Sequence, residues 1–288
     1  MTYRINIDLN NATSFDIRKL GRKIIKDTLV IVRNQNLSPE RLIEICDLIG
    51  DVDNRGQKNP FKHDQFEQIT KVTNEKLPSG ENAGLFATEE LGWHSDINTR
   101  VLSSINDCCS AMYIVKTGED SITSFVNLAA AYSDLSYMRK LEVSKLECWF
   151  EFKNNTFYNF EDTDREYKSY INPNSHHVGN WKPLVIEHPS RLIPNGYSAD
   201  KGLFWSHHFI RKFRDIETKE EYSLEDKQEL FDFLMNHVFQ EKYIYHHYWV
   251  TGDVVFSDQI LSLHKRTKPK GDRLLWRVGM NYKWLQWV

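Results

Sequence analysis

The sequence lacks any apolar run long enough to cross a membrane. About twenty consecutive apolar residues are needed to span a bilayer, and no stretch of the chain approaches that length. Residues 1–8 (MTYRINID) also lack the continuous apolar segment of a signal peptide. We therefore expect a cytoplasmic protein with no membrane partner.

Cysteine is scarce, and neither sign of charge is in large excess. The four cysteines form no C-x-x-C pair, and the neighbours Cys108 and Cys109 can hardly bridge each other without strain. We expect reduced, buried thiols. A net charge of −3 gives no sign of the basic surface that binds nucleic acid, so we expect no nucleic-acid partner.

Internal repeats and low-complexity linkers are missing too, which favours one domain over residues 1–288. Hydrophobic residues make up 40% and aromatic residues 13% of the chain, a composition that suits a packed, β-rich core. Between residues 145 and 181 the apolar periodicity gives way to aromatic, acidic and asparagine-rich sequence. We interpret this segment as a variable lid.

Local patterns predict helices that flank several short strands. Ser38 followed by Pro39 is typical of a helix start, and apolar residues at helical spacing continue to Ile49. A second helix is predicted to begin with Ser223 as its cap and to bury a stripe within residues 230–238. Apolar runs predict strands at 29–32, 243–250, 253–258 and 274–276.

Residues 93–96 (WHSD) carry the first candidate for chemistry. His94 and Asp96 lie at i and i+2, so on an extended strand both side chains emerge on one face and can reach one ion. His264 follows the strand predicted at 253–258, and a closed sheet would carry it to the same region. Two imidazoles and one carboxylate form the facial set that binds Fe(II) and leaves positions for a cosubstrate and dioxygen. A structural zinc site would be closed instead.

Two arginines follow His264 and flank the apolar run at 274–276. Arg273 or Arg277 can bind a carboxylate there through two parallel hydrogen bonds. Such a pair has an obvious role in anchoring a dicarboxylate but none in simple water activation. It therefore favours an oxygenase over a zinc hydrolase.

Other histidines have simpler explanations. Doublets at 176–177, 207–208 and 246–247 invite a second metal site, but adjacent residues on a strand point to opposite faces. Structural or surface roles are favoured for them. An isolated His-x-Asp is a weak signal in a chain with eleven histidines. The prediction of a metal site therefore depends on the whole ordered set, His94, Asp96 and His264 with the two arginines that follow.

Five ordered segments together resemble the TauD/TfdA-like family, the taurine dioxygenase group of Fe(II)- and 2-oxoglutarate-dependent oxygenases. They resemble the family's opening strand and helix, its His-x-Asp segment, its "T-x-F-x-(D/N)" segment, its "P-(L/V)-V-x-x-H-P" strand, and its "W-x-x-G-D" strand with the distal histidine. In this chain they are residues 28–50, 93–96, 123–132, 182–189 and 249–266.

The resemblance implies a β-rich α+β fold, a double-stranded β-helix (jelly-roll, cupin-like) barrel with flanking helices and a variable lid. It assigns a facial metal site for Fe(II) and makes 2-oxoglutarate and O2 the cosubstrates. The metal ligands carried over are His94, Asp96 and His264. The residues carried over for the distal carboxylate of 2-oxoglutarate are Thr123 and Arg277, with Arg273 as a nearby second arginine.

The chain departs from the family pattern at two places. The glycine pair that precedes the threonine is replaced within residues 120–122, and the Asp-Asn pair before the distal histidine reads Asp258-Gln259. The metal ligands themselves are retained. Retention of Asp96 argues against halogenation, because iron halogenases of this broader class lack the carboxylate.

The activity implied is oxidation of a small molecule coupled to conversion of 2-oxoglutarate into succinate and CO2. Judged from the reactions of family members, we expect hydroxylation of an unactivated C–H bond in a small polar or anionic molecule. Desaturation, epoxidation or cyclisation on the same fold stays open, as does a catalytically silent barrel acting as an accessory binding module. Dimers and tetramers are common in the family, so homo-oligomerisation is open too.

Four residues are candidates for contact with the substrate. Trp93 adjoins a metal ligand, although core packing is its default role. Arg100 could bind an anion, although an arginine after a strand is commonly solvated. Trp205 and His208 lie where the family places residues near its substrates.

Overall fold

The computed structural model describes residues 3–52, 61–84, 87, 90–97, 108–118, 122–151, 179–188 and 201–282. Its largest sheet has seven strands in the order β1-β2-β15-β6-β17-β3, with β4 paired to β17. The strands are β1 (Arg4–Ile5), β2 (Leu29–Val32), β15 (Val254–Asp258), β6 (Cys109–Lys116), β17 (Leu274–Tyr282), β3 (Gly50–Val52) and β4 (Thr70–Thr73).

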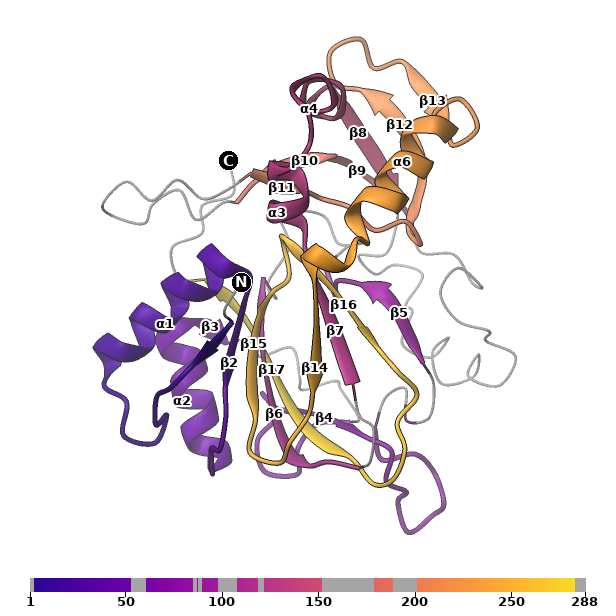
Figure 1. Ribbon diagram of the computed structural model, residues 1–288. Helices are drawn as coiled ribbons and strands as arrows, with labels where there is room; N and C mark the ends of the chain where they lie inside the picture. The colour runs from indigo at the N-terminus through magenta and orange to yellow at the C-terminus, as the bar shows by residue number, and fades with distance from the viewer. Residues whose placement is uncertain are drawn as a thin grey trace.

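A four-stranded sheet faces strands β15, β6 and β17 across the barrel (Figure 1). Its order is β14 (Ile244–Tyr248), β7 (Ile122–Asn127), β16 (Ser262–Arg266) and β5 (Leu91–His94), all antiparallel. Apolar side chains from both sheets fill the space between them, among them Ile31, Met112, Phe125, Val255 and Leu275. These facing sheets confirm the predicted β-rich barrel.

A third sheet and a short pair of strands lie above the barrel in Figure 1. The third sheet has the order β13 (Glu221–Ser223), β12 (Ile210–Asp215), β8 (Leu146–Phe150) and β9 (Asn180–Pro183). The pair is β10 (Val185–Glu187) with β11 (Lys201–Leu203). Strands β8 and β9 therefore form the two ends of the segment we interpreted as a lid, and residues 152–178 between them lie outside the described residues.

Helices flank both the barrel and the sheet above it (Figure 1). Both α1 (Ser14–Asp27) and α2 (Pro39–Ile49) lie beside the edge of the large sheet (Figure 1). The other helices among the described residues are α3 (Leu128–Ser133), α4 (Tyr137–Ser144), α6 (Gln228–Val238) and the 3₁₀ helix η3 (Glu241–Tyr243). No helix in the described part of the chain is long and apolar enough to cross a membrane.

The helix starts show where sequence patterns succeeded and where one failed. Ser38 Oγ accepts a hydrogen bond from Arg41 N at 3.2 Å, with Pro39 in the first turn, as predicted. The second helix begins at Gln228 and not just after Ser223. Ser223 instead ends β13 and forms a turn in which its N and Oγ both donate to Asp226. A Ser-x-x-Asp turn can satisfy its own backbone without a helix, so this predicted start was wrong.

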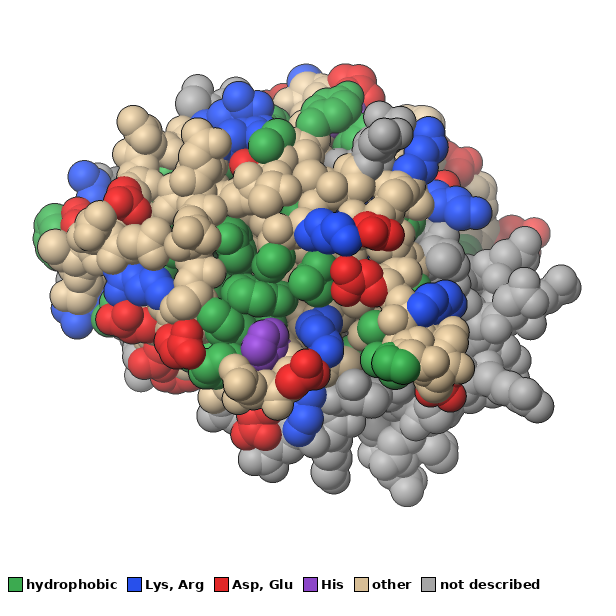
Figure 2. All heavy atoms as spheres, turned by 90° about the horizontal axis from the view of Figure 1, so that it is seen from below, with side chains coloured by type: hydrophobic (Ala, Val, Ile, Leu, Met, Phe, Trp, Pro, Cys, Tyr) green, Lys and Arg blue, Asp and Glu red, His purple; other side chains and the backbone are tan. Residues whose placement is uncertain are grey.

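Charge is evenly mixed where the barrel is viewed from below. Basic and acidic side chains alternate around a central group of hydrophobic ones (Figure 2). The described part of this face therefore carries no extended area of one sign.

Candidate metal centre and its arginine-lined pocket

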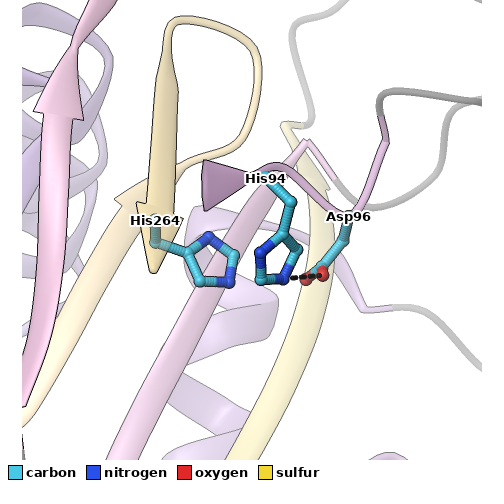
Figure 3. A group of neighbouring side chains, drawn as sticks. All are labelled: His94, Asp96 and His264. Atoms are coloured by element: carbon cyan, nitrogen blue, oxygen red, sulfur yellow. Dashed lines mark ion pairs between the residues drawn. The ribbon is translucent and has the colours of Figure 1, made fainter. Parts of the chain in front are cut away.

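His94, Asp96 and His264 come together on the inner side of the four-stranded sheet. His94 ends β5 and is the register partner of His264 on β16, so the two strands place the imidazoles side by side. One ligand atom from each of the three residues lies within 4.8 Å of the other two (Figure 3). Two imidazole nitrogens and one carboxylate oxygen at this spacing suit a single Fe(II) ion bound on one face.

Hydrogen bonding and burial prepare both imidazoles for metal binding. His94 Nδ1 lies 2.8 Å from Gly92 O, a contact that makes Nδ1 the protonated nitrogen and leaves Nε2 as a ligand. His94 Nε2 is 3.8 Å from Asp96 Oδ1 (Figure 3). Burial lowers the pKa of His94, and burial with the adjacent His94 lowers the pKa of His264 to about 3. Both rings are thus neutral at pH 7, the form that binds metals.

Gln259 ties the segment that carries Asp96 to the large sheet. Its side-chain oxygen accepts from Asp96 N at 3.3 Å, and its backbone oxygen accepts from Ser95 Oγ at 2.5 Å. Its side-chain nitrogen donates to Ser110 Oγ and Ser257 Oγ, each at 3.0 Å. In the sequence Gln259 stands out only as a departure from the family pattern, and no local signal there indicates its contact with the segment that carries Asp96.

Asp258 anchors the same turn from the other side. Its Oδ2 accepts from Tyr282 Oη and contacts His188 Nε2, both at 2.9 Å, and its Oδ1 accepts from the backbone of Ile260 and Leu261. All of these polar groups are buried. The turn that joins β15 to β16, and so leads to His264, is consequently held by buried hydrogen bonds.

Arg273, just before β17, and Arg277, within β17, occupy different environments. Leu275 belongs to the core between the sheets, so alternation directs Arg273 and Arg277 to the same inner face. Arg277 Nη2 is 2.6 Å from Asp96 Oδ2 and half-buried with it. Arg273 is only 3% exposed, and its Nε has no hydrogen-bond partner. No ion pair joins Arg273 to another described residue, and burial, followed by the like charge of Arg266, lowers its pKa to about 9.

Arg273 is therefore a buried cation that needs an anion, because burying an unpaired charge is costly. Thr123 lies close by on β7 and is also 3% exposed. Its Oγ1 accepts from Trp249 Nε1 at 2.8 Å, and Arg273 Cζ lies 5.9 Å from the centre of the Trp249 ring. This hydroxyl and guanidinium fit one carboxylate of a small diacid.

The candidate substrate residues separate in the structure. Trp93 lies on the opposite face of β5 from His94, stacked on Phe239 at 5.3 Å, which is a packing position. Trp205 is fully buried against Phe231 at 5.2 Å. His208 lies beside β5, since a Cβ added to Gly92 would be 3.0 Å from its Nε2. Arg100 lies outside the described residues.

Comparison with known proteins identifies the class. The family described as "Taurine catabolism dioxygenase TauD, TfdA family" matches residues 2–278. The chain is 26% identical, over 270 residues, to an alpha-ketoglutarate-dependent 2,4-dichlorophenoxyacetate dioxygenase of Cupriavidus pinatubonensis, an alignment that covers 90% of this chain and 86% of that one. An enzyme of the same name from a Burkholderia species is 25% identical, over 90% of this chain and 83% of its own length.

Two solved structures share the fold. A taurine dioxygenase from Burkholderia xenovorans superposes with a TM-score of 0.70 at 18% identity, covering 98% of this chain and 87% of that chain. AAD-2, solved with Mn(II) and N-oxalylglycine, gives 0.67 at 18% identity, with 98% and 94% covered. This chain belongs to the TauD/TfdA family and is an Fe(II)- and 2-oxoglutarate-dependent dioxygenase, 2-oxoglutarate being another name for alpha-ketoglutarate.

Proposed function

We propose that this dioxygenase hydroxylates an unactivated C–H bond of a small polar or anionic molecule. The balanced reaction is substrate C–H plus 2-oxoglutarate plus O2, giving substrate C–OH, succinate and CO2. The main support for a 2-oxoglutarate site is Arg273, which is buried near Thr123 without an ion-pair partner among the described residues. It lies in the same barrel as the metal triad. Iron bound at the triad would supply the oxygen activation, and the protein supplies binding and orientation.

We assign the distal carboxylate of 2-oxoglutarate to Arg273 and Thr123. Thr123 is paired in register with Arg266 on β16, two residues beyond His264. Two residues along a strand span roughly 7 Å, a distance that a five-carbon diacid can cover while its keto-acid end reaches the metal. The resemblance favoured Arg277 for this role, but the partner of Arg277 is Asp96. We therefore exchange the roles of the two arginines.

Arg277 has a different task in this proposal. By holding Asp96 Oδ2 at 2.6 Å it leaves Oδ1, the oxygen nearer His94, for the metal. Its guanidinium borders the metal and is partly accessible, so it can also meet an anionic group of the substrate. The curated relatives act on 2,4-dichlorophenoxyacetate, itself a carboxylate, which supports a small anion. His208 beside β5 is the candidate for a polar contact on the substrate.

The test is an anaerobic titration of the apo-protein with Fe(II) and then with 2-oxoglutarate. The signal that is measured is the weak visible charge-transfer band of the chelate. We expect the band in the wild type and its loss in His94→Ala. His246→Ala is the matched control, because His246 contacts Ser124 and Glu241 and lies outside the triad. Arg273→Met should raise the 2-oxoglutarate concentration required about ten- to hundredfold.

No band in a folded, iron-loaded wild type would defeat the proposal and favour an accessory binding module. With the band established, succinate release identifies substrates. Product analysis then separates hydroxylation from desaturation, epoxidation or cyclisation, because these outcomes share the same triad. A product with one added oxygen and no new double bond or ring supports hydroxylation.

A further inference from the structure

Trp249 contacts both residues of the proposed carboxylate site, Thr123 and Arg273, although it is not itself one of the proposed ligand-binding residues. Its indole N–H donates to Thr123 Oγ1 at 2.8 Å, and both side chains are buried. A threonine hydroxyl has one proton to donate and two lone pairs that accept. Because one lone pair receives the indole proton, the hydroxyl is oriented to donate its own proton to an acceptor on another side.

The Trp249 ring also contacts two further polar side chains, Arg273 and His247. Arg273 Cζ is 5.9 Å from the ring centre, and the His247 ring meets Trp249 edge-on, with centroids 4.5 Å apart and planes at 86°. A guanidinium over an indole face is favourable and restricts where the cation lies. One side chain therefore contacts both members of the proposed carboxylate clamp.

Hydrogen bonds fix the turn that follows Trp249. Asp253 Oδ2 accepts from Val250 N at 3.0 Å and from Arg33 Nη1 at 2.9 Å. Gly252 has φ +89°, and its N donates to Ile114 O at 3.0 Å. These bonds join the turn to Arg33, which follows β2, and to β6, and so fix the backbone next to Trp249. The indole itself is held by its bond to Thr123 Oγ1 and by its burial.

We propose that Trp249 is a positioning residue for 2-oxoglutarate, which orients the Thr123 hydroxyl as a donor and supports the Arg273 guanidinium against the distal carboxylate. This rests on the proposed function of the Thr123 and Arg273 pocket. A residue that served core packing alone would affect all ligands of the metal equally. A positioning residue affects only those that carry a distal carboxylate.

The experiment measures ligand binding to the Mn(II)-loaded full chain by calorimetry, so it requires no turnover. Trp249→Phe keeps an aromatic ring but removes the N–H donor, Thr123→Val removes the hydroxyl, and the double variant combines them. The probes are 2-oxoglutarate and 2-oxopentanoate, which has a methyl group in place of the distal carboxylate. Trp276→Phe is the matched control, since Trp276 packs on Tyr113 and His63 on the other face of β17.

We expect Trp249→Phe to weaken 2-oxoglutarate binding about fivefold and Thr123→Val about tenfold, with the double variant close to Thr123→Val alone. Binding of 2-oxopentanoate should change less than about twofold in all of them. Equal losses for both ligands, no loss in Trp249→Phe, or losses that multiply in the double variant would each overturn the inference.

Different results would show that the proposed 2-oxoglutarate site itself is wrong. If wild type binds no 2-oxoglutarate, the cosubstrate assignment falls and this inference with it. If wild type binds but both Thr123→Val and Arg273→Met bind equally well, the distal carboxylate lies elsewhere and Trp249 has no such role.

A second measurement covers the case in which Trp249→Phe does not fold. In ¹⁵N-tryptophan protein loaded with redox-inert Zn(II), the indole resonance that moves in Thr123→Val must also move when 2-oxoglutarate is added. A resonance that moves with Thr123→Val but ignores 2-oxoglutarate would overturn the inference.

Discussion

Arg277 and Asp96 form an ion pair of 2.6 Å between residues 181 positions apart, and the carboxylate in that pair is also the expected metal ligand. The pair divides the work of the two carboxylate oxygens, one facing the arginine and the other facing His94. A partner that orients a ligating group commonly changes metal affinity by ten- to a hundredfold. The arginine thus belongs to the metal centre as well as to the pocket.

Arg277→Met should accordingly raise the dissociation constant for Fe(II) or Mn(II) about tenfold or more, measured anaerobically without any cosubstrate. The effect follows because Asp96 loses the group that holds its second oxygen. Arg139→Met is the control: Arg139 pairs with Glu142 and Glu229 at the surface, and its loss should leave metal affinity unchanged. Equal affinity in Arg277→Met and wild type would contradict the division of roles.

Gln259→Leu should destabilise the protein and loosen the metal together. It removes the acceptor for Asp96 N and two bonds donated to Ser110 and Ser257, whose buried hydroxyls then keep only their bond to each other. We expect a loss of about 2–4 kcal/mol in the free energy of unfolding, measured by urea denaturation of the apo-protein. Gln259→Asn, one methylene shorter, should recover only part of it. Full stability in Gln259→Leu would show that the network carries little energy.

Gly252→Ala should cost more than Gly80→Ala, although both glycines have φ +89°. A Cβ at Gly252 would lie 2.7 Å from Gln35 O, whereas one at Gly80 meets nothing within 4 Å. Both variants carry the backbone cost of about 1 kcal/mol, and only Gly252→Ala adds a clash. The comparison of their unfolding free energies isolates that clash. Equal losses would indicate that the turn after Trp249 relaxes freely.

Acid should destabilise the apo-protein partly through His207. Burial, followed by the neighbouring His208, lowers the pKa of His207 to about 3 from an ordinary 6.5. The folded state therefore holds this ring neutral while the unfolded state protonates it, so stability is complete above pH 6.5 and declines as the pH falls towards 3. One such group contributes a slope of at most about 1.4 kcal/mol per pH unit.

His207→Phe removes that proton difference and should flatten the decline between pH 6.5 and 4, measured as unfolding free energy against pH. His246→Ala is the control, because His246 is partly exposed and bonded to Ser124 and Glu241. An unchanged slope in His207→Phe would mean that this ring is not held neutral by the fold.

Local chemistry in the sequence was sufficient to predict that His94 and Asp96 can reach one ion. His94 and Asp96 share a face because a strand alternates, whatever the rest of the chain does. The apolar runs at 29–32 and 253–258 likewise become buried central strands, and Ser38 with Pro39 starts a helix as expected. These features depend on neighbours within a few residues, which is why the order of residues alone determined them.

Contacts between distant segments were decided only by tertiary structure. Gln259 reaches Asp96 across 163 residues, and Trp249 reaches Thr123 across 126. Arg273 and Arg277 lie four residues apart, one just before β17 and one within it, and face the same way, so no local pattern distinguishes them. The packing of this segment against the facing sheet buries Arg273 without an ion-pair partner among the described residues and sets Arg277 against Asp96. Packing between sheets depends on every residue that fills the barrel, so a local pattern cannot specify it.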